Sequence, residues 1–265
     1  MEELSWYHYV LSALGGAAAG AVNTLAGNGS AITLAILTEL IGLPGATANA
    51  TNRIGIAAQS YASIGAYRRS GKFDLGRSRW IIGLMVLGSV FGMLVAVWIS
   101  NEQFTQVFRF LMVLMLFVIL IKPERWLRET DPSKKMSLWV AVPCFLALGF
   151  YGGFIQLGMG LFFLALMVLV ARYSILESNV VKVTVTGIYT TLAILLFQAK
   201  GMINWPVGLA IALGQGIGGY ATAHFAATHP KAGVVAHRLL VITVILVLLQ
   251  LFQLPALFLQ YLRGS

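Results

Sequence analysis

Apolar residues along the chain gather in long blocks instead of alternating with polar residues. Uninterrupted blocks of about 20 residues are each long enough for a helix that crosses a lipid bilayer. An outer-membrane barrel would instead show short segments of alternating polarity. The pattern therefore predicts an all-α integral membrane protein, with spans at 46–67, 80–100, 104–122, 178–199, 204–226 and 237–261.

Two further apolar regions, 6–42 and 137–172, are interrupted in the middle by glycine and polar residues. The first break runs from Asn23 to Ser30, and the second runs from Tyr151 to Gly160. Irregular backbone in lipid would lack hydrogen-bond partners, so it is tolerated only inside protein or beside a polar cavity. We therefore expect each region to be a hairpin of two half-length or tilted helices that meet at the break.

The distribution of basic residues predicts the orientation of the chain. Lysine and arginine are concentrated in the loops 68–79, 122–135 and 227–238, and they are sparse in 100–103 and 198–205. Basic loops stay in the cytoplasm. The first three loops are therefore predicted to be cytoplasmic, which places both chain termini outside and makes the two hairpins enter from opposite sides.

The first half of the chain also resembles the second half, because Asn49, Gly71 and Gly88 recur at a constant offset as Asn179, Gly201 and Gly218. Together with the orientation, this predicts two inverted repeats, each a broken hairpin followed by three spans. The repeats cover 1–122 and 137–265, joined by a cytoplasmic linker at 123–136. Inverted repeats with interrupted helices are typical of secondary transporters, whose site lies near the midplane. The alternative is a duplication kept only for folding.

Composition narrows the function further. The chain is 58% hydrophobic and 10% charged, with a formal net charge of +9, and its nine acidic residues all lie at a terminus, in a loop or at a helix end. Cation transporters and proton pumps usually need a buried carboxylate. The basic excess suits membrane loops better than nucleic-acid binding. With one cysteine, Cys144, and no cluster of metal ligands or nucleophile–base pair, we expect no enzyme activity, cofactor or metal.

Positive charge does occur within the predicted spans, at Arg53 and Lys182, which take nearly equivalent positions in the two halves. A charge inside a span costs about 2.5–3.5 kcal/mol or more, so both are functional candidates, with snorkelling to an interface as the alternative. Ser30 is predicted to cap a helix over 31–40 whose N-terminus faces the break and favours an oxyanion. The predicted anion site comprises Asn23, Asn28, Gly29, Ser30, Thr33, Asn49, Asn52, Arg53, Gln59, Gln156, Gly158, Gly160, Lys182 and Thr186.

The sequence segments 23–30, 42–44, 48–53 and 67–72 together resemble the TauE/SafE sulfite exporter family of bacterial permeases. The resemblance is strongest over residues 20–75 and covers most of the chain. It implies export of sulfite or small organosulfur anions across the inner membrane. We expect a secondary transporter that works by alternating access, with a small anion and the lipid bilayer as partners. An anion channel on the same fold is the alternative, and the oligomeric state stays open, with a homodimer as one option.

Overall fold

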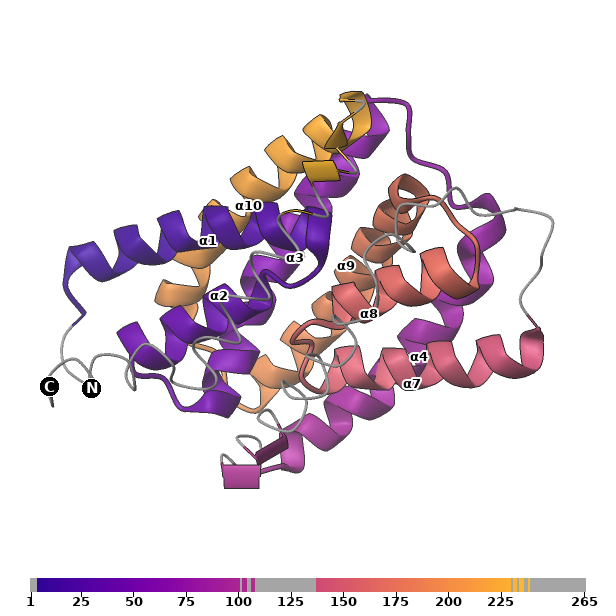
Figure 1. The fold of residues 1–265 in the computed structure, drawn as a ribbon. Helices are drawn as coiled ribbons and strands as arrows, with labels where there is room; N and C mark the ends of the chain where they lie inside the picture. The colour runs from indigo at the N-terminus through magenta and orange to yellow at the C-terminus, as the bar shows by residue number, and fades with distance from the viewer. Residues whose placement is uncertain are drawn as a thin grey trace, which may run out of the picture.

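The computed structural model describes residues 4–100, 102–103, 106–107, 137–229, 231–232, 234–235 and 238, and this part of the chain is built of helices (Figure 1). The predicted spans 104–122 and 237–261 lie almost entirely outside the described residues. The α-helices are α1 (Trp6–Ala26), α2 (Ser30–Ala35), α3 (Gly45–Arg69), α4 (Arg79–Trp98), α7 (Leu138–Phe154), α8 (Met159–Ala165), α9 (Ile175–Ala199) and α10 (Trp205–Thr228). Two π-helical segments, Ile36–Leu40 and Leu166–Val170, continue α2 and α8, and a short 3₁₀ turn, Gly76–Ser78, precedes α4.

Local sequence signals set where these helices begin and end. Ser174 and Glu177 form a capping box at the start of α9, with the Ser174 Oγ accepting from the Glu177 N–H at 3.2 Å. The Asn204 Oδ1 accepts from the Val207 N–H at the start of α10. Gly27 ends α1 with a positive φ of 78°, which glycine adopts without strain. Because these signals act over short distances in the chain, the helix ends lie close to their predicted positions.

Each predicted broken region is a helical hairpin. Residues 27–29 connect α1 to α2, and residues 155–158 connect α7 to α8. In Figure 1, α1 and α7 approach the middle of the molecule from opposite sides, and the two connections lie between them. The hairpins therefore place both breaks in the interior.

The backbone of the first half recurs in the second half at a constant offset. The two π-helical segments correspond residue for residue, and so do α3 and α9 at both ends. Gly42 and Arg172 both have positive φ values, of 73° and 62°, and Gly71 and Gly201 both have φ of 65°. The order of elements is thus the same in both halves, while their opposite orientation in a membrane stays a prediction.

Close helix packing pairs elements from different halves. Gly16 and Gly20 of α1 lie against the backbone of α10, where a Cβ on Gly20 would be 2.4 Å from the Gln215 carbonyl oxygen. On α4, a Cβ on Gly92 would be 1.9 Å from the Phe150 carbonyl oxygen of α7. Small residues spaced four apart allow such close approach between membrane helices. The pairs α1–α10 and α4–α7 are therefore held together by backbone contact.

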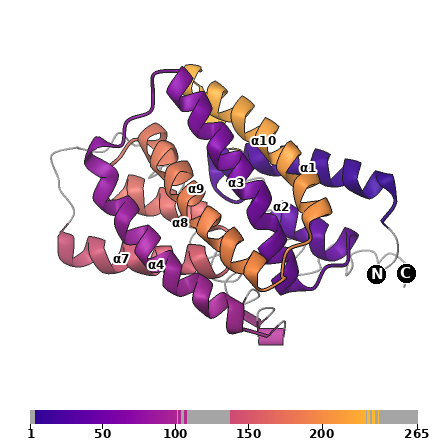
Figure 2. The ribbon, with the colours of Figure 1, turned by 180° about the vertical axis from the view of Figure 1, so that it is seen from behind.

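These pairs organise the described helices into two bundles, which lie side by side in Figures 1 and 2. The first bundle comprises α1, α2, α3 and α10, and the second comprises α4, α7, α8 and α9. Helices α3 and α9 face each other between them, where the Tyr61 hydroxyl and the Thr191 Oγ1 are 2.7 Å apart. Each bundle takes helices from both halves of the sequence.

Three stretches of the described chain, Trp6–Ala26, Gly76–Trp98 and Ile175–Ala199, are long and apolar enough to cross a membrane by length and composition. Helix α3 is long enough but far more polar, and most of its residues are buried against other helices. Its polar residues therefore face protein, which is where the candidate site lies.

Candidate functional site

Arg53 of α3 is fully buried and binds the C-terminal end of α7 in the other bundle. Its Nη1 donates to the Gly152 carbonyl oxygen at 2.8 Å, and its Nη2 donates to the Gly153 carbonyl oxygen at 2.9 Å. The Nη1 also donates to the Oε1 of Gln156 in the break. The last carbonyls of a helix have no partner within the helix and carry partial negative charge. The guanidinium therefore caps α7.

Lys182 of α9 makes the reciprocal contact with the end of α1. Its Nζ donates to the carbonyl oxygens of Asn23 and Thr24, at 2.9 and 2.8 Å, and to the Asn179 Oδ1 at 2.7 Å. An ammonium group has three N–H donors, so all of them are satisfied by neutral acceptors. Each cation thus links the two bundles by capping a broken helix of the opposite one.

The structure decides two points about these cations. Snorkelling is wrong for both, because Arg53 is 0% and Lys182 3% exposed and their charged groups contact interior backbone. Helix α9 begins at Ile175 where α3 begins at Gly45, and this register makes Lys182 equivalent to Asn52 and not to Arg53. The two cations therefore play matching roles from adjacent positions of the repeat.

No carboxylate compensates these charges in the described part of the chain, where no ion pair forms and every buried ionic side chain is basic. A helix C-terminus contributes roughly half a negative charge. Two full positive charges therefore face two half charges, which leaves the interior between the bundles electropositive.

The two breaks touch at their glycines. A Cβ on Gly27 would lie 2.6 Å from the Gly160 Cα, and a Cβ on Gly160 would lie 2.5 Å from the Gly27 Cα. Side chains cannot be accommodated at such distances. The breaks of the two hairpins therefore meet backbone to backbone inside the molecule.

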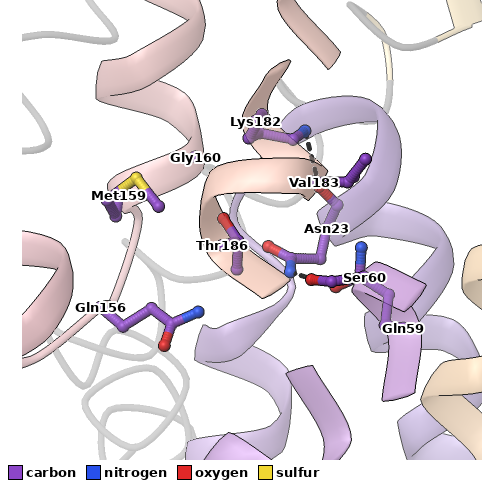
Figure 3. Close-up of a pocket in the computed structure, with 9 residues that line it drawn as sticks. All are labelled: Asn23, Gln59, Ser60, Gln156, Met159, Gly160, Lys182, Val183 and Thr186. Atoms are coloured by element: carbon purple, nitrogen blue, oxygen red, sulfur yellow. Dashed lines mark hydrogen bonds between the residues drawn. The ribbon is translucent and has the colours of Figure 1, made fainter. Parts of the chain in front are cut away.

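A small polar cavity lies beside this contact (Figure 3). Its volume, taken over the positions open to the centre of a water molecule, is about 10 Å³, which is room for about one water. Lys182 is the charged residue in its wall. The lining residues are Asn23, Gln59, Ser60, Gln156, Met159, Gly160, Lys182, Val183 and Thr186.

Six residues of the predicted site line this cavity: Asn23, Gln59, Gln156, Gly160, Lys182 and Thr186. Other predicted residues form hydrogen bonds between the helices that surround the cavity. Asn49 donates to the Phe154 carbonyl oxygen at 3.2 Å and supports the Arg53 cap, and the Asn52 Oδ1 accepts from Gln215 at 3.2 Å.

The first break differs in detail from its prediction. Gly29 occupies the N-cap position of α2, and Ser30 is already helical and makes no side-chain cap. The Thr33 hydroxyl donates within the helix to the Ser30 carbonyl oxygen. Asn28 is fully buried, and its amide has no hydrogen-bond partner among the described residues. These residues shape the break but do not line the cavity.

The second break supplies Gly158 and Gln156 in left-handed backbone conformations, with φ values of 65° and 61°. A residue other than glycine in this region costs on the order of 1–3 kcal/mol and is found mainly at functional sites. The bond from Arg53 holds the Gln156 side chain in place at the cavity. Gly158 is the N-cap of α8 and lies outside the lining.

Ser60, Met159 and Val183 line the cavity but were not among the predicted residues. Ser60 follows Arg53 by two helical turns, so the two share one face of α3. That spacing was available in the sequence. The positions of Met159 and Val183 follow from how the hairpin packs, which no local pattern indicates.

Comparisons with known proteins agree with the resemblance seen in the sequence. The family described as sulfite exporter TauE/SafE matches residues 12–251. A probable membrane transporter protein, ORF9, of Sinorhizobium sp is 24% identical over 257 residues, which is 96% of each chain. No solved structure matches the chain.

Proposed function

Because the chain belongs to the TauE/SafE sulfite exporter family of membrane transporters, we propose that it is a secondary transporter that exports sulfite or a short organosulfonate. Export takes place across the bacterial inner membrane, with both termini outside and the two repeats inserted in opposite orientations. The family name indicates the class of cargo. The residues at the centre of the molecule must then be able to bind the negative charge of that cargo.

The observation that carries this proposal is the pair of buried cations at the helix breaks. Arg53 and Lys182 are hydrogen-bonded only to neutral acceptors, so their charge is incompletely neutralised. A positive interior attracts an anion and repels a cation. The arrangement therefore suits a small anion and argues against a metal ion or protonated amine as cargo.

Unpartnered polar groups near the breaks also favour a polar cargo. The Ser60 hydroxyl, the Asn28 amide and the Arg53 Nε are buried without hydrogen-bond partners among the described residues. A buried polar group left unpaired costs about 1–3 kcal/mol. Of these groups, the Ser60 hydroxyl lies in the cavity wall, where an oxyanion brought in by the transport cycle can reach it.

Alternating access fits the closed cavity better than a channel does. A pore needs a continuous path, whereas the cavity has room for about one water and lies beside the Gly27–Gly160 contact. A sulfite ion is larger than a water molecule and requires the bundles to separate. We therefore propose that the two bundles, rather than the two sequence halves, rock against each other across α3 and α9.

The membrane potential can drive export in this scheme. Moving one elementary charge across about 100 mV is worth about 2.3 kcal/mol, and a negative cell interior expels anions. No buried carboxylate exists in the described residues to carry a proton in exchange. Potential-driven export is therefore part of the proposal.

A flux assay tests the proposal. The purified protein is reconstituted into liposomes, and uptake is measured for sulfite, sulfate, sulfoacetate and chloride. We expect saturable sulfite or sulfoacetate uptake, together with counterflow of labelled substrate. Flux without counterflow, at rates that do not saturate, would instead identify an anion channel.

Lys182→Met supplies the residue-level test. A unit charge about 4 Å from an anion is worth about 4 kcal/mol at an effective dielectric constant near 20. The variant is therefore expected to weaken the apparent affinity for sulfite by about a hundredfold or more. Lys182→Arg keeps the charge and should retain measurable uptake. Lys200→Met, which changes an exposed lysine outside the cavity, is the control, and an equal loss in that variant would contradict the assignment.

A further inference from the structure

A directional chain of hydrogen bonds runs through α1, α3 and α10 and ends at the cavity. The Ser63 hydroxyl donates to the Gly219 carbonyl oxygen at 3.1 Å, and its Oγ is 3.3 Å from the Thr24 Oγ1. The Gln59 Nε2 donates to the Thr24 Oγ1 at 3.0 Å. The Asn23 Nδ2 donates to the Gln59 Oε1 at 2.6 Å.

The carbonyl at the end of this chain fixes the direction of every bond. A main-chain carbonyl oxygen only accepts, and a hydroxyl group has one proton to donate. Because Ser63 donates its proton to Gly219, it accepts from Thr24. Thr24 has then no further proton to donate and accepts from the amide nitrogen of Gln59. The Gln59 oxygen is left to accept from Asn23.

Asn23 consequently presents its amide oxygen to the cavity. Figure 3 shows the Asn23 nitrogen on Gln59 and its oxygen on the side of Thr186. This oxygen has no partner among the described residues. On the other wall, Arg53 holds the Gln156 Oε1, so the Gln156 amide nitrogen is the group left to face the cavity.

The cavity therefore combines one fixed acceptor, one fixed donor, the unpartnered Ser60 hydroxyl and the Thr186 hydroxyl beside one cation, Lys182. A fixed acceptor repels a fully deprotonated oxyanion and binds an oxyanion that still carries an O–H. The cost of burying an ion also rises with the square of its charge. One cation, already hydrogen-bonded to neutral groups, suits one negative charge better than two.

We propose that the transported species is a singly charged oxyanion that retains one proton, such as hydrogensulfite, with its O–H donated to the Asn23 amide oxygen. Ser63 is a positioning residue in this proposal, because it sets the orientation of Asn23 through Thr24 and Gln59 without lining the cavity. The proposal rests on the proposed export of a sulfur oxyanion and specifies its protonation state.

The test measures sulfite flux in proteoliposomes that have the same pH on both sides, with protein-free liposomes subtracted, first at fixed total sulfite and then at a fixed concentration of hydrogensulfite. In the second series the concentration of the proposed cargo does not change with pH, so a decline there reports an effect of pH on the protein itself. We expect the flux to fall about tenfold for each pH unit above the second ionisation of sulfurous acid at fixed total sulfite, and to stay constant at fixed hydrogensulfite.

The variant Ser63→Ala removes the hydroxyl that fixes the direction of the hydrogen-bond chain, and it leaves the cavity lining unchanged. Thr24, Gln59 and Asn23 can then reverse their bonds and turn the Asn23 nitrogen toward the cavity. We expect the decline of sulfite flux with pH to become at least threefold shallower per unit. Ser12→Ala deletes a buried hydroxyl that is not part of the hydrogen-bond chain, so this variant should keep the original pH profile.

The outcomes separate this inference from the function on which it rests. Sulfite flux that holds or rises as the dianion replaces hydrogensulfite would overturn the inference and leave sulfite export intact. An unchanged pH profile in Ser63→Ala would also overturn it. Absence of sulfite flux at every pH, with the protein folded, would remove the proposed function itself.

Discussion

At the scale of single residues, buried charged side chains cap the ends of the broken helices in the described part of the chain. Arg53 lies 99 residues before Gly152 in the sequence, yet its guanidinium is the group that satisfies the end of α7. The sequence marked Arg53 as a candidate because charge within a span is costly. It did not reveal that the first partners of this charge are protein carbonyls, since a contact over that separation follows from the tertiary fold.

Replacing Arg53 by alanine should therefore destabilise the protein as well as weaken transport. The substitution leaves the carbonyl oxygens of Gly152 and Gly153 without their donor in a buried site. At about 1–3 kcal/mol for each unpaired group, we expect a loss of about 3 kcal/mol, seen as a lower thermal unfolding midpoint in detergent. Arg53→Lys should recover part of it. An unfolding midpoint equal to that of Arg69→Ala, an exposed control, would contradict the capping role.

At the scale of elements, the two hairpins depend on backbone contact between their breaks. We expect Gly160→Ala to abolish most transport, because the new Cβ would lie 2.5 Å from the Gly27 Cα and force the breaks apart. The control is Gly83→Ala in α4, where a Cβ meets no atom within 4 Å. Flux and unfolding midpoint are measured for both variants. Near-normal flux in Gly160→Ala would show that the contact is dispensable.

The ends and breaks of the helices could be predicted from the sequence because local chemistry determines them. Gly27, Ser174 and Asn204 act on close neighbours in the chain, so their effect is visible in a short window. The pairing of α1 with α10 could not be predicted in this way. It depends on glycines in the first and last described helices, such as Gly20 and Gly218, and many other glycine pairs would serve equally well on sequence grounds.

The candidate site residues also divide into those that the local sequence indicates and those that depend on tertiary contacts. Asn23, Gln156 and Lys182 were found because polar or charged side chains beside a glycine break would be costly in lipid and so point to a polar interior. Ser60 was missed although its spacing places it on the same face of α3 as Arg53, because α3 carries many other polar residues. The role of Ser63 was also hidden, since it depends on the direction of a hydrogen-bond chain that crosses three helices.

At the scale of the whole molecule, the repeats are interlocked rather than adjacent. Each bundle contains helices of both halves, and the cations of one bundle cap the broken helices of the other. Tyr61 contacts Thr191, which takes the same place in α9 as Tyr61 takes in α3. Contact between equivalent positions is expected on an axis of two-fold pseudosymmetry, which lies in the membrane plane for inverted halves and along the membrane normal for parallel ones. The proposal that the halves have opposite orientations therefore needs a separate test.

Cysteine labelling tests that proposal directly. In a Cys144→Ser background, single variants Lys72→Cys and Lys200→Cys place a thiol at exposed positions after α3 and after its counterpart α9. If the halves are inverted, a membrane-impermeant maleimide added to intact cells should label Lys200→Cys, and it should label Lys72→Cys only after the membrane is opened. The basic residues around Lys72 predict which of the two faces the cytoplasm. Equal labelling of both positions in intact cells would mean parallel halves, in which case α1 and α7 could not enter from opposite sides of the membrane.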